Sequence, residues 1–166
     1  MKNHNQYVIL LGGNLGDVLN TFRLVIKELT QSAHEMPQCS MVYQSESWGF
    51  QSPHLFLNQV CILQTWLEPS EMMKYLLDIE KKFGRNRGEQ TETYHSRTLD
   101  LDILFVNEEI IDKPGLQVPH PRLHQRNFSL VPLFEIMPNF RHPVLNKTIA
   151  ELYKNSTDKS IITPIG

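Results

Sequence analysis

Hydrophobic and polar residues alternate most regularly from residue 99 to residue 105, in the sequence Leu-Asp-Leu-Asp-Ile-Leu-Phe. This is the two-residue period of a β-strand, so it places Asp100 and Asp102 on one face. The opposite face, expected to be buried, takes Leu99, Leu101, Ile103 and Phe105. Two like charges at this spacing repel each other, and Mg²⁺, which binds one or two carboxylates together with phosphate oxygens, relieves the repulsion. The stretch therefore predicts a Mg²⁺–nucleotide site, with a solvated strand face as the alternative.

The other hydrophobic patterns predict an alternation of strands and helices. Strands are expected at residues 7–11, 39–45, 56–66 and 99–105. Helices are expected at residues 15–31, 69–83, 128–137 and 148–154. Pro132 is expected to break the third helix. The first six elements have the order strand, helix, strand, strand, helix, strand.

Length and charge narrow the class of protein. At 166 residues the chain is long enough for one domain with its own core, and a net charge of −2 gives no general attraction to nucleic acid or anionic lipid. Cys39 and Cys61 form no C-x-x-C pair, which is typical of buried free thiols in a reducing compartment. No apolar run is long enough to cross a membrane. We expect a single catalytic domain over residues 1–166 in the cytoplasm, with the tail after about residue 155 loosely held.

Several polar segments carry candidate chemistry. Residues 12–17 form a turn that contacts a ligand or simply joins a strand to a helix, and residues 85–96 fit a mobile lid or a solvated loop. Prolines stiffen the chain around His120, so this segment is suited to hold side chains in fixed contact with an anion. Asn58 stands among apolar neighbours in a strand, so its amide needs partners from the backbone or from a bound heterocycle. Aromatic residues in the loop 47–53 indicate either contact with a flat ligand or packing into the hydrophobic core.

Taken together, these segments resemble the 6-hydroxymethyl-7,8-dihydropterin pyrophosphokinase family of folate biosynthesis. The resemblance runs from about Tyr7 to Pro138 in the family's order. It rests most on Arg-Thr-Leu-Asp-Leu-Asp at 97–102 and Val-Pro-His-Pro-Arg at 118–122, supported by Gly-Gly-Asn-Leu-Gly at 12–16, Phe-Leu-Asn at 56–58 and Gly-Arg-Asn-Arg at 84–87.

The resemblance implies a fold and a reaction. The fold is α+β, a ferredoxin-like sandwich with a mostly antiparallel sheet and helices packed on it. The reaction transfers pyrophosphate from ATP to the hydroxymethyl group of 6-hydroxymethyl-7,8-dihydropterin and releases AMP, with two Mg²⁺ ions as cofactors and a lid that closes. ATP and the pterin are then the partners of a monomer that binds neither nucleic acid nor membrane.

The resemblance also implies which residues act on the nucleotide. Asp100 and Asp102 look like the ligands of both metal ions, and Arg85 and Arg97 resemble lid arginines that reach the ATP phosphates. These four are the catalytic candidates. The remaining nucleotide contacts would come from Glu80, Ile103, His120 and Arg126.

The pterin would be held by a second group of residues. Phe56 and Phe128 look like the two rings between which it stacks, and Asn58 resembles the amide that reads its edge. The rest of this pocket would come from Ser45, Glu46, Trp48, Tyr94 and Asp100.

The chain departs from the family's pattern at a few positions. Phe56 replaces a tyrosine that is common in the family, and Tyr94 stands where a lid tryptophan is often found. Leu77 occupies a position where a polar residue faces the nucleotide, and Pro121 replaces an aromatic residue seen in some members.

Two other functions are compatible with the same patterns. A ferredoxin-like RNA-binding module would need basic and aromatic residues on its sheet, which the net charge of −2 and the aspartate pair disfavour. A nucleotidyltransferase could use the same aspartates with another acceptor, and it would release pyrophosphate in place of AMP.

Overall fold

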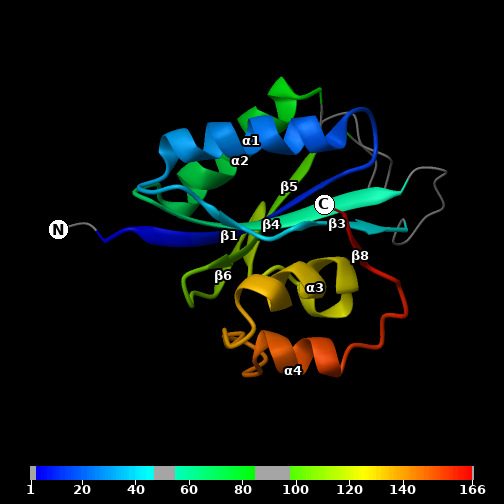
Figure 1. Ribbon diagram of the computed structural model, residues 1–166. Helices are drawn as coiled ribbons and strands as arrows, with labels where there is room; N and C mark the ends of the chain where they lie inside the picture. The colour runs from blue at the N-terminus through cyan, green and yellow to red at the C-terminus, as the bar shows by residue number, and fades with distance from the viewer. Residues whose placement is uncertain (1–2, 47–54, 85–97, 166) are drawn as a thin grey trace.

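The computed structural model describes residues 3–46, 55–84 and 98–165. Within them one large antiparallel sheet separates two layers of helices, with α1 and α2 on one face and α3 and α4 on the other (Figure 1). None of the described helices is long and apolar enough to cross a membrane. In chain order, the elements are β1 (Asn5–Gly13), α1 (Val18–Ser32), β2 (Gln38–Cys39), β3 (Val42–Ser45), β4 (Phe56–Thr65), α2 (Pro69–Lys82), β5 (Asp100–Val106), β6 (Ile111–Lys113), β7 (Leu116–Val118), a 3-10 turn (Leu123–Gln125), α3 (Asn127–Ile136), α4 (Ile149–Lys154) and β8 (Thr163–Ile165).

The sheet has the strand order β5-β1-β4-β3-β8, and β2 also pairs with β4. Each pair of neighbouring strands is antiparallel. The two helices that connect strands, α1 and α2, lie on one face, which is the arrangement of a ferredoxin-like sandwich. The α+β fold and its topology are therefore confirmed.

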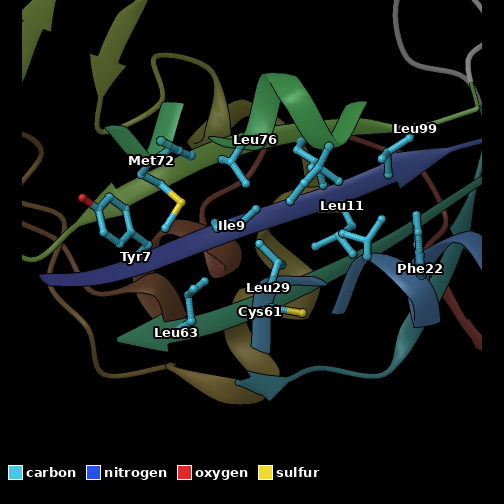
Figure 2. Packing of buried hydrophobic residues seen from close by; sticks show 14 of the residues in the cluster. Tyr7, Ile9, Leu11, Phe22, Leu29, Cys61, Leu63, Met72, Leu76 and Leu99 are labelled. Carbon is cyan, nitrogen blue, oxygen red and sulfur yellow. The ribbon is translucent and has the colours of Figure 1, made fainter. Parts of the chain in front are cut away.

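The first core lies between the sheet and the helices α1 and α2. Figure 2 shows Ile9 and Leu11 of β1 among Leu29 of α1 and Leu76 of α2, and all four side chains are buried. The helices form here because their apolar residues repeat at helical spacing and meet the sheet as one stripe. Strand β1 is the centre of this layer, since β4 and β5 flank it on either side.

The second core lies on the opposite face, under α3 and α4. Val8 and Leu10 of β1 point into it, alternating with the residues that face the first core. Both faces of β1 are therefore buried from Tyr7 to Gly13, which explains why its sequence is an uninterrupted apolar run after Asn5 and Gln6. The second core places α3 directly over the sheet face that carries Asp100 and Asp102.

Strand β5 contains a β-bulge at Leu104. Val8 pairs with Phe105 and Ile9 with Ile103, so Leu104 is an extra residue in the ladder. A bulge reverses the faces of the residues that follow it. Phe105 therefore belongs to the second core, and the prediction that it shares a face with Leu99 was wrong. The alternation predicted from residue 99 to residue 103 is confirmed.

Other predicted elements differ in their limits. The strand expected at residues 39–45 is divided into β2 and β3, because the Ser40 hydroxyl accepts the Val60 N–H at 3.0 Å and interrupts the regular ladder. Pro132 does not break α3, which runs through it to Ile136, because one missing N–H is outweighed by the buried packing of the helix on the second core. The cysteines are free thiols on neighbouring strands, with Cys61 buried and Cys39 half-buried.

The tail after about residue 155 was expected to be loosely held, and the structure differs. Asp158 accepts a hydrogen bond from the backbone N–H of Asn127 at 2.8 Å. Farther along, β8 joins the sheet beside β3. A segment with such contacts is held to the body of the protein.

His142 is a buried histidine that must stay neutral for its contacts to persist. Its Nδ1 accepts hydrogen bonds from the N–H groups of Val144 and Leu145, both at 3.1 Å. Burial, with a further contribution from His124, lowers the pKa of His142 from 6.5 to about 4. Protonation of Nδ1 would remove the acceptor of both bonds.

This histidine should make stability depend on pH. As the pH falls from 6.5 to 4 the unfolded chain binds a proton that the folded state excludes, so the free energy of unfolding decreases over that window. We expect His142 to contribute a loss on the order of 2 kcal/mol. Urea unfolding of the natural chain and of His142→Asn, which keeps an acceptor oxygen but does not titrate, should show the smaller loss in the variant. Equal losses would contradict this assignment.

Candidate active site

One row of residues crosses four strands on the face beneath α3. Gly12 of β1 pairs with Asp100 on one side and with Asn58 on the other, and Asn58 pairs in turn with Tyr43. Residues in register on a sheet point to the same face, so the Asp100 carboxylate and the Asn58 amide flank a position that has no side chain. Asp102 lies in the next row on this face, opposite Leu10.

The amide and hydroxyl predicted for the pterin pocket are in contact. Asn58 Nδ2 donates a hydrogen bond to Ser45 Oγ at 3.1 Å, and both side chains are buried. Phe56 lies opposite Ser45 on the same face, two residues before Asn58. The hydrogen bond fixes the orientation of the amide, so that a polar group is held rigidly at a largely apolar surface.

Helix α3 supplies the other side of this region. Phe128, in its first turn, packs against the second core that lies between α3 and the sheet. The guanidinium of Arg126 lies 5.3 Å from the centre of the Phe128 ring, within the range of a cation–π contact. The structure thus brings Phe128 and Arg126 together at the start of α3.

His120 is held in one tautomer beside the strand that carries the aspartates. The backbone N–H of His120 donates to the Leu104 carbonyl at 3.0 Å, and the imidazole Nδ1 accepts from the backbone N–H of Arg122 at 3.2 Å. Burial, then the charge of Arg126, and to a smaller extent Arg122 lower the pKa of His120 to about 4, while Asp100 opposes them. The imidazole is neutral at pH 7, and its proton is on Nε2, where it can be donated to an anion.

A cavity of about 580 Å³ opens between α2, β5 and the β6–β7 hairpin. This volume lies in the range of small-molecule sites. Of the predicted residues, Asp102, Ile103 and His120 line it. Sequence reasoning missed Met73 of α2 and the hairpin residues around Gln117, which line it as well. The Pro-Gly turn at 114–115 is a sequence signal for the β6–β7 hairpin. The position of this hairpin beside β5 depends on tertiary packing and has no such signal.

Glu80 is buried on the other side of β5. It comes from α2, is 1% exposed, and its Oε1 accepts the backbone N–H of Leu101 at 2.8 Å. Leu101 lies between the two aspartates, and β5 is an edge strand of the sheet. The Glu80 carboxylate therefore fixes the edge of the strand that presents Asp100 and Asp102.

The remaining predicted residues are placed only in part. Glu46 is exposed directly after β3. Thr98 Oγ1 donates to the Phe83 carbonyl at 2.9 Å, which brings the two chain ends that flank residues 85–97 together near Asp100. Trp48, Arg85, Tyr94 and Arg97 lie outside the described residues.

The aspartate pair fits Mg²⁺ better than a metal that needs a complete protein cage. In the described part of the chain, three or more His, Cys, Asp or Glu side chains do not gather into a metal-binding group. Asp100 and Asp102 share one strand face, with Cα atoms about 7 Å apart by strand geometry. Mg²⁺ takes one or two carboxylates and completes its octahedron with water and phosphate, so these two hard oxygen donors suit it.

Gly13 allows β1 to approach the start of β5. A Cβ at this position would lie 2.7 Å from the Thr98 carbonyl oxygen, which is backbone and cannot turn aside. We expect Gly13→Ala to lower the free energy of unfolding by about 1–3 kcal/mol in urea titrations. Gly12→Ala is the matched control and should cost less, because its Cβ would meet the side-chain Asn58 Oδ1 at 3.3 Å and the Leu57 carbonyl oxygen at an ordinary 4.0 Å. A larger loss of stability in Gly12→Ala than in Gly13→Ala would contradict the close approach of Gly13 to the Thr98 carbonyl.

A model of the 7,8-dihydro-6-hydroxymethylpterin-pyrophosphokinase family matches residues 8–138, which include the aspartate row, the cavity and α3. The chain belongs to this family. As a member of the pyrophosphokinase family it is an enzyme, a transferase of folate biosynthesis.

Relatives across most of the chain carry the same function in their names. The 2-amino-4-hydroxy-6-hydroxymethyldihydropteridine pyrophosphokinase of Synechocystis sp. is 38% identical over 159 residues, covering 95% of this chain and 79% of the relative. The Aquifex aeolicus protein of the same name is 36% identical over 149 residues, covering 90% of this chain and 91% of the relative. Wild-type Plasmodium falciparum HPPK-DHPS matches the fold with a TM-score of 0.71 at 16% identity, covering 93% of this chain. This pyrophosphokinase spans 45% of that longer chain.

Proposed function

We propose that this pyrophosphokinase transfers pyrophosphate from ATP to the hydroxymethyl group of 6-hydroxymethyl-7,8-dihydropterin, with Mg²⁺ and by direct in-line displacement. The observation that carries the proposal is the row Asp100, Gly12 and Asn58 on one sheet face. It sets a metal-binding carboxylate beside a polar group fit for a heterocycle, with only backbone between them. The names of the relatives give the same pteridine and a pyrophosphokinase activity for those proteins.

The pterin subsite is proposed between the sheet and α3. The Asn58 amide, held by Ser45, presents donor and acceptor groups to the edge of a flat heterocycle. Phe56 and Phe128 supply rings from the sheet side and the helix side, respectively, which suits stacking on both faces of the ligand. Glu46, Trp48 and Tyr94 are proposed to complete this subsite.

The nucleotide subsite is proposed in the cavity beside β5. Ile103 and Met73 offer apolar surface for a base, and Asp102 and His120 mark the end at which phosphates would lie. A neutral His120 can donate a hydrogen bond from its Nε2–H to a phosphate oxygen without the free-energy cost of desolvating a charged imidazolium. Arg126 is proposed to add a positive charge near the phosphates, and its proximity to His120, whose pKa it lowers, supports this.

Asp100 and Asp102 are proposed to hold two Mg²⁺ ions over the triphosphate. When bound, such ions polarise phosphoryl oxygens and bring the attacking and leaving oxygens into line. The hydroxymethyl oxygen forms the new bond to the β-phosphorus, the bond between that phosphorus and the α,β-bridging oxygen breaks, and AMP leaves with the electron pair. The hydroxyl proton is released. Arg85 and Arg97 are proposed to reach the phosphates when a lid closes and excludes water.

The decisive experiment separates the nucleotide products. The purified chain, ATP, MgCl₂ and 6-hydroxymethyl-7,8-dihydropterin should yield AMP and the pterin diphosphate in equal amounts. Release of pyrophosphate would instead indicate nucleotidyl transfer and would overturn the proposal, as would the absence of any pterin-dependent product. We also infer a cytoplasmic monomer without affinity for nucleic acid, which gel filtration and an RNA filter-binding assay would test.

A further inference from the structure

The chain after α4 returns to the two walls of the proposed pterin subsite. Residues 155–165, here called the C-terminal segment, run from the end of α4 past α3 and reach the sheet at β8 (Figure 1). The segment therefore touches the start of α3 and the edge of the sheet in turn.

The first contact is made at Asn127, the residue between Arg126 and Phe128. Three hydrogen bonds join it to the C-terminal segment. The Asn127 N–H donates to Asp158 Oδ2 at 2.8 Å, its Nδ2 donates to the Asp158 carbonyl at 3.1 Å, and its Oδ1 accepts from Ser156 Oγ at 2.8 Å. The backbone and the side chain of Asn127 are thus both fixed, which restricts the residues on either side of it.

The Asp158 carboxylate completes the start of α3. The first N–H groups of a helix have no partner within it, and Asp158 accepts the first of them from outside the helix. Its other oxygen accepts from Ser160 N at 2.9 Å and from Ser160 Oγ at 2.6 Å. Burial opposes the charge, but the hydrogen bonds from Ser160 and Asn127 outweigh it and lower the pKa of Asp158. The carboxylate is charged at pH 7 and complements the positive end of the helix dipole.

The second contact is made on the sheet. β8 pairs with β3, with Val42 opposite Ile165 and Gln44 opposite Thr163. Gln44 is the direct neighbour of Ser45, the hydroxyl partner of Asn58. The C-terminal segment is thus joined both to the helix wall and to the sheet wall of the proposed pterin subsite.

We propose that Asp158 is a positioning residue, which holds the first turn of α3 so that Arg126 and Phe128 face the phosphates and the pterin. This role rests on the proposed function of those two side chains. A contact of purely structural value would contribute to stability and leave substrate binding alone.

The test compares two variants that each remove a helix cap. Asp158→Ala removes the acceptor at the start of α3. Thr148→Ala is the matched control, because Thr148 Oγ1 caps α4 by accepting the Glu151 N–H at 3.2 Å, and the control affects a helix end that carries no proposed site residue. Both variants should lower the melting temperature, Asp158→Ala by the larger amount because its carboxylate also accepts two hydrogen bonds from Ser160. Only Asp158→Ala should raise the KM values for pterin and ATP and lower kcat, with a loss of about 10- to 100-fold in kcat/KM.

A third variant allows the positioning role to be tested even if Asp158→Ala folds poorly. Asp158→Asn retains an oxygen for the Asn127 N–H but presents an amide to Ser160, so its kcat/KM should lie between those of Asp158→Ala and the natural chain. Wild-type kinetics in both Asp158 variants, or equal kinetic losses in Thr148→Ala, would overturn the positioning role. If Phe128→Ala weakens pterin binding while the Asp158 variants do not, the proposed function stands and the positioning role fails. If the natural chain forms no AMP, both fail together.

Discussion

Replacing Asp102 with asparagine is expected to lower kcat by about 100- to 1,000-fold, because polarisation of a phosphoryl oxygen by a bound metal supplies several kcal/mol. The same result is expected for Asp100→Asn. An asparagine keeps the size and one oxygen of the side chain but removes the charge that is proposed to hold Mg²⁺. AMP formation measured across a range of MgCl₂ concentrations should show both a lower maximum and a weaker apparent affinity for the metal.

The control for this experiment is Asp78→Asn. Asp78 is exposed on α2, so the substitution removes the same charge from the protein without touching β5. Its kcat and Mg²⁺ dependence should match those of the natural chain, and all three variants should retain the circular dichroism of the folded protein. Turnover near the natural rate in Asp102→Asn would show that the metal assignment is wrong.

Phe128→Ala is expected to weaken pterin binding by about 10- to 100-fold, since a stacked ring contributes its buried area and a further 0.5–1.5 kcal/mol of aromatic contact. ATP binding should change much less, because the cavity beside β5 does not include this side chain. Isothermal calorimetry with each ligand separately would measure both effects. Unchanged pterin affinity would refute the stacking role.

Phe134 provides the matched control on the same helix. Its ring is 43% exposed and lies 5.4 Å from the ring of Tyr153, on the outer side of α3 where α4 packs. Phe134→Ala removes an equal aromatic group from the same element and should leave both affinities unchanged. A comparable loss in the two variants would indicate that α3 as a whole, and not the Phe128 ring, was disturbed.

The sequence predicts the acidic strand well because its period is a local property. Asp100 and Asp102 share a face as expected, and the opposite face is buried up to Ile103. The bulge at Leu104 has no local signal, since Leu, Phe and Val follow one another there without a polar residue to mark the change of face. The change of face at Phe105 follows from the pairing of β5 with β1. The residue pattern of β5 alone carries no information about that pairing.

Long-range contacts explain the other differences. The family resemblance alone places Glu80 near the nucleotide, and only the packing of α2 on the sheet shows its hydrogen bond to Leu101. The composition of the C-terminal segment is polar, so it predicts a loose tail. The hydrogen bonds between Asp158 and Asn127 join residues 31 positions apart, and no periodicity in the sequence reports them. Sequence patterns therefore find the strand that carries the proposed metal ligands, but not the groups that hold this strand in place.

The central strand β1 has a consequence for how the protein can be divided. Its residues from Tyr7 to Gly13 are all buried, yet β5, its partner on one edge, and α3, its cover on one face, both come from the second half of the chain. A fragment that stops before residue 100 would expose an uninterrupted apolar strand with an open edge, the form most prone to intermolecular pairing. Nascent chains of this enzyme are therefore expected to need protection until α3 has been synthesised, and neither half would persist as an independent folding unit.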